Sequence, residues 1–260
     1  GLSAGSFLIS TMSYGMGIKK FKPLGKVGVV LATLLLVLAP MFLIIDLGQP
    51  LRFWHLFPYL NFKSAITWGS FLLVAYPLNC LIYGFNMFNG NDKLTKMFGL
   101  IGIPLAISVH GYTGFILALI KARALWNTAL MPIYFLVSAM VSGIALMILV
   151  VFIQNLIRRD KQLNIDLAAD LGKILVITII FDLFLVLSDV LVLLNSDTEA
   201  REGAAMLLVG SFRPYFLGVE IILGSIIPLI LLLLPFTRRN PITLSFAAIL
   251  AMIGVFAMRY

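Results

Sequence analysis

Four ionisable residues lie inside long apolar stretches of this sequence: His110, Asp182, Asp189 and Glu220. A charged side chain costs about 2.5–3.5 kcal/mol at the centre of a membrane helix, so each of these residues needs a reason to be there. A neutral imidazole both donates and accepts hydrogen bonds and titrates near pH 7, which suits a group that holds a carbonyl and exchanges its proton. Carboxyl groups at depth are suited to passing protons.

The spacing of the acidic residues supports this chemistry. Asp182 and Asp189 are seven residues apart, which is two turns of an α-helix, so they share one face and can pass protons through intervening waters. Arg213 and Glu220 have the same spacing, which places them within reach through water. The alternatives are that each acid pairs with an arginine or caps a broken helix, and that His110 only bonds a neighbouring helix.

Uncharged polar residues also occur within the apolar stretches and could line a path for protons toward the cytoplasm, although each is also suited to helix packing. They are Asn79, Tyr83, Tyr134, Ser138 and Ser142.

The elements that position these residues must be membrane-spanning helices. Of the 260 residues, 61% are hydrophobic and 12% are charged, and the mean hydropathy is +1.07, which excludes a soluble enzyme. A bilayer offers the backbone no hydrogen-bond partners, so the apolar segments must be helical. We expect an all-α integral membrane protein of about eight transmembrane helices in two four-helix bundles. The segments are roughly 1–17, 25–46, 64–86, 97–120, 129–157, 171–194, 213–235 and 241–258.

The charges and the scarce metal-binding residues add two expectations. The alternating loops hold 12 and 7 of the 19 Lys and Arg residues, so the positive-inside rule predicts an N-terminus outside the cytoplasmic membrane. The single cysteine, Cys80, excludes an intrachain disulfide and argues against an iron–sulfur cluster or a structural zinc site. The two histidines, His55 and His110, would allow at most one haem. We expect no metal site in this protein, contact with the lipid bilayer, and no contact with nucleic acid.

Five motifs follow one another along nearly the whole sequence. They are GLSAGSF at 1–7, DLGQPLRFW at 46–54, HGYTGF at 110–115 with ARALWNTALMPIYFLVSAMVSG at 122–143, GSFRPYFLGVEIILGSIIP at 210–228, and GVFAMRY at 254–260. Together they resemble the NrfD/PsrC family, the integral membrane subunits of polysulfide-reductase-like complexes. The resemblance implies a single NrfD-like transmembrane domain over 1–260, truncated at both ends.

The resemblance also implies a protein with no haem or iron–sulfur cluster of its own, together with a quinone cofactor, partners and a location. Its members bind a quinone, either menaquinone or ubiquinone, near the outer face of a prokaryotic cytoplasmic membrane. They exchange electrons with a ferredoxin-like subunit that carries [4Fe–4S] clusters. That subunit in turn connects to a molybdopterin enzyme, a multihaem cytochrome or a hydrogenase. The expected function is electron exchange between quinone and the iron–sulfur subunit, with proton translocation as an added expectation.

Residue by residue, His110 matches the family's histidine near the quinone head group, and Asp46 falls in the turn that faces the quinone and the iron–sulfur partner. The catalytic residues expected on these grounds are His110, Asp46 and Asp189. The expected quinone-binding residues are His110, Asp46, Tyr112 and Arg213. The expected proton path is Asp182, Asp189, Glu220 and Ser138. This expectation rests mainly on the cost of placing ionisable residues inside a membrane rather than on the resemblance. The expected docking rim for the partner is Arg52, Trp54 and His55.

Two other classes of protein remain open from the sequence. Helices broken by Pro77, Pro104, Pro132 and Pro228 around midplane acids also describe a secondary transporter, although the two halves show no visible repeat. A non-catalytic membrane anchor is the other alternative, but a bare anchor would not need His110 and three acids at depth.

Overall fold

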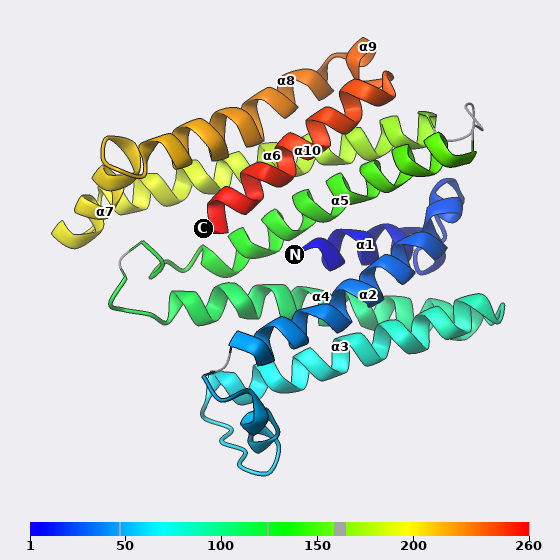
Figure 1. Ribbon diagram of the computed structural model, residues 1–260, viewed down its shortest axis with the longest axis horizontal. Helices are drawn as coiled ribbons and strands as arrows, with labels where there is room; N and C mark the ends of the chain where they lie inside the picture. Colours follow the sequence, from blue (N-terminus) through cyan, green and yellow to red (C-terminus); the bar gives the residue numbers. More distant parts are fainter. Residues whose placement is uncertain (47, 124, 159–164, 260) are drawn as a thin grey trace. The chain divides into compact units, whose positions relative to one another are not determined.

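A computed structural model describes residues 1–46, 48–123, 125–158 and 165–259 of the protein (Figure 1). Within these ranges the regular structure is entirely helical, which confirms the expected all-α class. Seven helical segments are long and apolar enough to cross a membrane. They correspond to α2 (Lys22–Asp46), α3 (Ala65–Phe88), α4 (Asp92–Ala118), α5 (Met131–Arg158), α6 (Ile165–Leu194), η3 (Pro214–Ile226) continued by α8 (Ile227–Leu233), and α10 (Pro241–Arg259).

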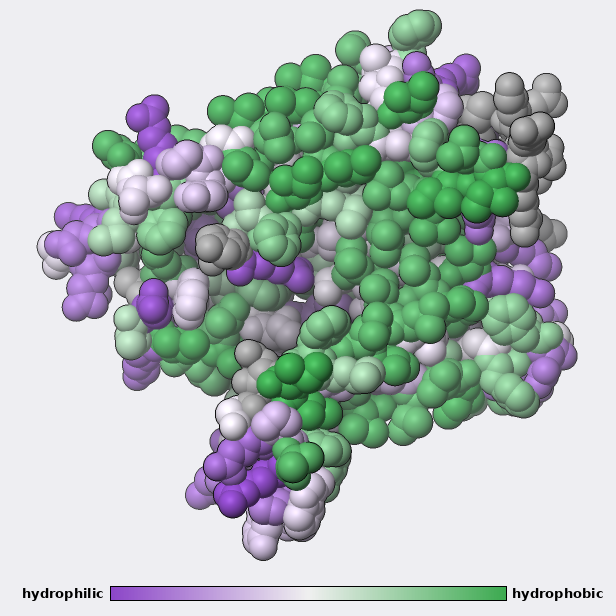
Figure 2. All heavy atoms as spheres, in the orientation of Figure 1, coloured by the Kyte–Doolittle hydropathy of each residue, from purple (hydrophilic) through white to green (hydrophobic). Residues whose placement is uncertain are grey.

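The first expected span forms a shorter element. Helix α1 (Leu2–Tyr14) has 13 residues, fewer than the roughly 20 that a complete crossing needs. The remaining elements are short helices in the connections: η1 (Lys19–Phe21), η2 (Pro50–Leu56), α7 (Thr198–Leu208) and α9 (Pro235–Arg238). Figure 2 shows hydrophobic side chains over the visible surfaces of the helices and hydrophilic ones gathered mainly at their ends, as a lipid-facing surface requires.

The protein divides into two compact units, as the expectation of two four-helix bundles implies. Unit 2 comprises residues 6–116 and contains most of α1 together with α2, α3 and α4. Its core is aromatic, since the ring of Phe7 meets Tyr76 and Tyr83 edge-on at 5.5 Å between centroids. Interhelical hydrogen bonds add to this packing, because Ser10 donates to the carbonyl of Gly25 over 2.7 Å.

Unit 1 comprises residues 1–5 and 117–260, and its four spans are α5, α6, η3 with α8, and α10. Successive spans run in opposite directions (Figure 1), so one end of the unit gathers the start of α5, the end of α6, the start of η3 and the end of α10. Helix η3 packs closely against α10 through Gly224 and Gly254, whose backbones leave no room for a side chain. This close approach brings the polar residues of η3 and α10 toward those of α5 and α6.

Candidate functional site

Three carboxylates, a tyrosine and an arginine gather at that end of unit 1. We call them the carboxylate cluster. Its members are Tyr134 on α5, Asp182 and Asp189 on α6, Glu220 on η3, and Arg259 at the end of α10. The side chains of Asp182 and Glu220 are only 8% and 9% exposed, so both carboxyl groups are buried among the helices of unit 1.

Glu220 is held by a tyrosine from another helix. The hydroxyl of Tyr134 donates to Oε1 of Glu220 over 2.5 Å, across 86 residues of sequence. The hydroxyl of Ser225 donates to the backbone carbonyl of Glu220 over 3.1 Å. This i to i+5 relation belongs to the π-helical winding of η3, a form that often occurs at functional sites.

Arg259 links the cluster to a further residue of the expected proton path. Its Nη2 donates to Oγ of Ser138 over 3.2 Å, and its guanidinium lies 5.3 Å from the ring centroid of Phe135. Arg259 also interacts electrostatically with Asp182, whose Oδ1 is buried and has no hydrogen-bond partner among the described residues. The arginine therefore supplies the opposite charge that acts on this carboxylate.

A pocket of about 300 Å³ opens beside the cluster. Its polar lining comes from Tyr134, Asp189, Glu220 and Arg259, and the other lining residues are apolar and include Trp126. A mainly apolar pocket with a few converging polar groups is the usual form of a functional site. The structure thus brings Asp189, Glu220 and Arg259 to one cavity, with Ser138 joined to it through Arg259.

Arg213 is not brought to Glu220 in the expected way. Seven residues make two turns in an α-helix, and this spacing was the reason to expect Arg213 near Glu220. The residues that follow Arg213 wind instead as a π-helix, in which seven residues do not make two turns. Arg213 is exposed just before η3, and the carboxylate of Glu220 bonds Tyr134 instead.

His110 lies in unit 2, on α4. Its side chain is 6% exposed, its Nδ1 lies 2.8 Å from the carbonyl oxygen of Ala106, and its ring meets Tyr76 of α3 edge-on at 6.2 Å. The contact with Ala106 is within its own helix and fixes the orientation of the ring. The structure therefore presents a buried, oriented imidazole at the packing face between α3 and α4.

Tyr112 lies against the same neighbouring helix as His110. A Cβ atom added to Gly69 of α3 would come within 2.0 Å of the Tyr112 ring, so the missing side chain at Gly69 makes room for the phenol. Asp46 ends α2, but its side chain lies outside the part of the protein that the structure describes. The positions of His110 and Tyr112 place two hydrogen-bonding groups along one helix pair of unit 2.

The expected docking rim forms the short helix η2 between α2 and α3. Trp54 is 53% exposed and meets His55 edge-on at 4.1 Å, and His55 in turn meets Tyr59 at 5.7 Å. Arg52 is exposed on the same helix. An exposed group of aromatic and basic side chains has the composition of a protein interface.

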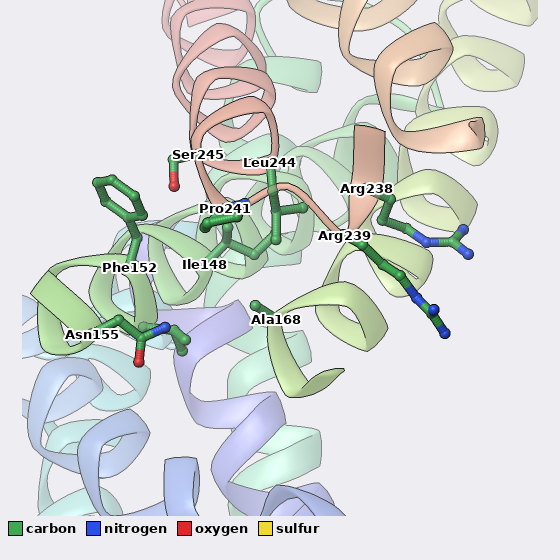
Figure 3. Close-up of a pocket in the computed structure, with 10 residues that line it drawn as sticks. Ile148, Phe152, Asn155, Ala168, Arg238, Arg239, Pro241, Leu244 and Ser245 are labelled. Carbon is green, nitrogen blue, oxygen red and sulfur yellow. The ribbon is translucent and has the colours of Figure 1, made fainter. Parts of the chain in front are cut away.

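A second cavity, at the opposite end of unit 1, is too small for a ligand. Its volume is about 10 Å³, close to the space that a single water molecule needs. Figure 3 shows that the guanidinium groups of Arg238 and Arg239 both point away from Ser245, so these polar groups do not converge. The pocket at the carboxylate cluster is therefore the better candidate in this unit.

Sequence reasoning missed two members of the cluster. The sequence identified Tyr134 only as an uncharged polar residue within an apolar stretch, and Arg259 only as part of the motif GVFAMRY at 254–260. Their roles depend on which helices pack together, which the hydropathy pattern does not reveal. Arg259 could have indicated the cluster from the sequence alone, because an arginine at the end of a transmembrane helix can pair with an acidic residue inside the membrane.

The fold and the site define an integral membrane protein with ionisable residues buried within its helical bundles. Comparison with known families matches residues 1–260 to the family described as "Polysulphide reductase, NrfD". The chain belongs to this NrfD family of membrane subunits.

Relatives support the assignment over the full length of the protein. A selenate reductase subunit of Mesobacillus selenatarsenatis is 30% identical, and the match covers 100% of this chain and 69% of the relative. The Hdr-like menaquinol oxidoreductase integral membrane subunit of Archaeoglobus fulgidus is 28% identical, with 100% and 66% covered. A polysulfide reductase subunit of Wolinella succinogenes is 30% identical over 56% of this chain and 52% of the relative. The protein thus spans about two thirds of the first two relatives and about half of the third.

Proposed function

We propose that this protein is the quinone-interacting membrane subunit of a multi-subunit respiratory oxidoreductase. The observation that carries the proposal is the buried, oriented imidazole of His110 between α3 and α4. It is supported by membership of a family in which one relative is named a menaquinol oxidoreductase membrane subunit. We place the protein in a prokaryotic cytoplasmic membrane with its N-terminus outside, on the distribution of Lys and Arg.

The residues of unit 2 fit a quinone head group. A quinone carbonyl needs a hydrogen-bond donor in an apolar setting, and Tyr112 and the imidazolium form of His110 carry such donors on a helix whose other surfaces are largely apolar. Because Nδ1 of His110 donates to the carbonyl of Ala106, its Nε2 would accept a hydrogen bond from a quinol hydroxyl when the ring is neutral and donate to a quinone carbonyl when the ring is protonated. When bound, the quinone supplies the redox chemistry, which exchanges electrons together with protons. His110 would hold the carbonyl and exchange its proton, and Asp46, which belongs to the same unit, completes the binding residues in this proposal.

A partner subunit would carry the electrons. We assign the exposed rim of Arg52, Trp54 and His55 on η2 to docking a ferredoxin-like subunit with [4Fe–4S] clusters. That subunit would connect to a catalytic subunit, such as a molybdopterin enzyme, a multihaem cytochrome or a hydrogenase. Relatives named as parts of selenate and polysulfide reductases support a partner of this kind.

The carboxylate cluster would move protons. Asp189 and Glu220 line the pocket and Asp182 lies deeper along α6, so protons would pass between the pocket and the membrane interior by way of these acids. Tyr134 can relay a proton to Glu220 through its 2.5 Å hydrogen bond. Ser138, whose Oγ accepts a hydrogen bond from Arg259, would add a further hydroxyl to this route.

Replacement of His110 tests the quinone assignment. In the assembled complex, His110→Ala should strongly reduce quinone turnover, because the carbonyl loses both its partner and its proton donor. Thr95→Ala is a matched control, since Thr95 is also buried on α4 and its hydroxyl donates to the backbone carbonyl of Asn91, the residue just before that helix. Turnover in His110→Ala equal to that of Thr95→Ala, with assembly intact, would remove His110 from the mechanism.

Replacement of Asp182 tests proton movement. In proteoliposomes, Asp182→Asn should lose proton movement or turnover, because the amide cannot carry the proton onward. Asp170→Asn is the control, because Asp170 lies on the same helix and pairs with Lys173 at 3.0 Å. If Asp182→Asn leaves both proton movement and turnover unchanged, protons do not pass through this carboxylate.

A further inference from the structure

A groove between α2 and α3 runs along the surface of unit 2. It consists of two cavities of about 350 and 320 Å³ that share the lining residues Val30, Leu34 and Phe88. The shared residues are exposed, with Leu34 at 59% and Phe88 at 55%. Gly84 of α3 lines the second cavity, and a Cβ atom there would meet only Val29, at 3.5 Å.

The length and lining of the groove match one acyl chain in one leaflet. From Lys26 to Leu34 it follows α2 for about 12 Å, at 1.5 Å per residue. One leaflet contributes about 15 Å to the hydrocarbon core. The groove therefore covers most of a leaflet's depth, and apart from Lys26 at one end its lining is almost entirely apolar.

The end of the groove carries positive charge. Lys26 lines it, and its Nζ lies 5.4 Å from the ring centroid of Phe88, within range of a cation–π contact that holds the ammonium over the groove mouth. Lys22 lies one turn earlier, with its Nζ 5.9 Å from the ring of Tyr14. Neither lysine forms an ion pair with a carboxylate within the described ranges.

The sequence around this end of the groove is rich in lysine. Four lysines fall between residues 19 and 26, and no acid follows until Asp46. Asp92 at the start of α4 acts electrostatically on Tyr14, the residue whose ring Lys22 contacts. A lysine-rich end above an apolar groove is complementary to a phosphate attached to an acyl chain.

We propose that the α2–α3 groove binds an anionic phospholipid, with an acyl chain along Val30 and Leu34 and its phosphate at Lys22 and Lys26. This site is independent of the proposed quinone function, because its residues are not among those assigned to quinone, protons or partner docking. A partner helix would also cover the apolar lining, but it would bring no phosphate to Lys22 and Lys26. The lipid is thus the occupant that uses both parts of the groove.

Native mass spectrometry of the full-length protein in its assembled complex tests the proposal, with phosphatidylglycerol and phosphatidylethanolamine offered in equal amounts. The wild type should retain phosphatidylglycerol in preference. The double variant Lys22→Gln/Lys26→Gln should bind it about 30-fold more weakly, the effect of two lysines at a membrane surface. The control Lys93→Gln/Lys96→Gln removes two exposed lysines of α4 that do not line the groove, and it should bind normally.

A second variant tests the acyl chain rather than the charge. Gly84→Leu fills the groove from its floor and should reduce binding of both lipids, while the added Cβ makes only an ordinary contact. Equal retention of the two lipids by the wild type, or unchanged phosphatidylglycerol binding in Lys22→Gln/Lys26→Gln, would overturn the proposal. So would a protein or quinone cross-linked to a photoreactive residue at Leu34 in place of lipid.

Discussion

The crossing of η3 and α10 at Gly224 and Gly254 should control the geometry of the carboxylate cluster. A Cβ atom added at Gly224 would lie 2.3 Å from the Cα of Gly254. Carbon atoms in contact need about 3.5–4.0 Å, so Gly224→Ala must separate the two helices by at least about 1.2 Å. The obstacle is backbone on both sides, and no change of rotamer can relieve it.

The energetic and geometric consequences can both be estimated. Overpacking of a well-packed interior costs about 1–3 kcal/mol, and we expect the upper end of that range because only helix movement relieves the clash. The hydroxyl of Tyr134 lies 2.5 Å from Oε1 of Glu220. If the shift of about 1.2 Å carries Glu220 away from Tyr134, these two oxygen atoms become too far apart for a hydrogen bond. The 3.2 Å bond from Arg259 to Ser138 would be broken in the same way if α10 moves instead.

Unfolding in mixed micelles, followed by circular dichroism, measures the stability of Gly224→Ala, and turnover in proteoliposomes measures its function. The matched control is Gly218→Ala on the same helix, where an added Cβ has no atom within 4 Å. That variant should stay within about 1 kcal/mol of the wild type. Equal stability and proton movement in the two alanine variants would show that the close crossing does not position Glu220.

Two smaller perturbations test single contacts. Tyr134→Phe removes the hydrogen bond to Glu220 and should lower the unfolding free energy by about 0.6–1.7 kcal/mol in the same micelle assay, and an unchanged value would mean that the bond contributes nothing. Gly69→Ala places a Cβ 2.0 Å from the Tyr112 ring and should raise the KM for quinone by displacing the phenol. Gly84→Ala on the same helix meets Val29 only at 3.5 Å, so a KM raised equally in both variants would count against a role for Tyr112.

The fold was predictable because the bilayer leaves few choices. An apolar segment such as 64–86 can only be a helix, and the structure has α3 at Ala65–Phe88. In the first segment, 1–17, the expected end is less accurate, because α1 ends at Tyr14. Residues 15–21 belong to the connection to α2.

The candidate site was predictable only in part. The cost of burying charge identified Asp182 and Glu220 as unusual, and the structure buries both. The partner of Glu220 was not predictable, because Tyr134 is 86 residues away and meets it only through the packing of α5 and η3. The expected proximity of Arg213 and Glu220 depended on α-helical spacing. The prolines and glycines of 214–226 do not distinguish a π-helix from an α-helix, so this error could not be avoided from the sequence.

The division of the protein into two units makes the proposed functions separable. The residues assigned to hold the quinone carbonyl, His110 and Tyr112, lie in unit 2, whereas all three acids of the proton path lie in unit 1. If electrons and protons are coupled, a variant of Asp182 in unit 1 must therefore alter turnover of the quinone that the residues of unit 2 are proposed to hold. The diagnostic phenotype is a lost dependence of turnover on the membrane potential with an unchanged KM for quinone, since only the path that moves charge would be affected. A raised KM in Asp182→Asn would instead mean that the carboxylate supports quinone binding, and the cluster would then be part of the quinone site rather than a proton path.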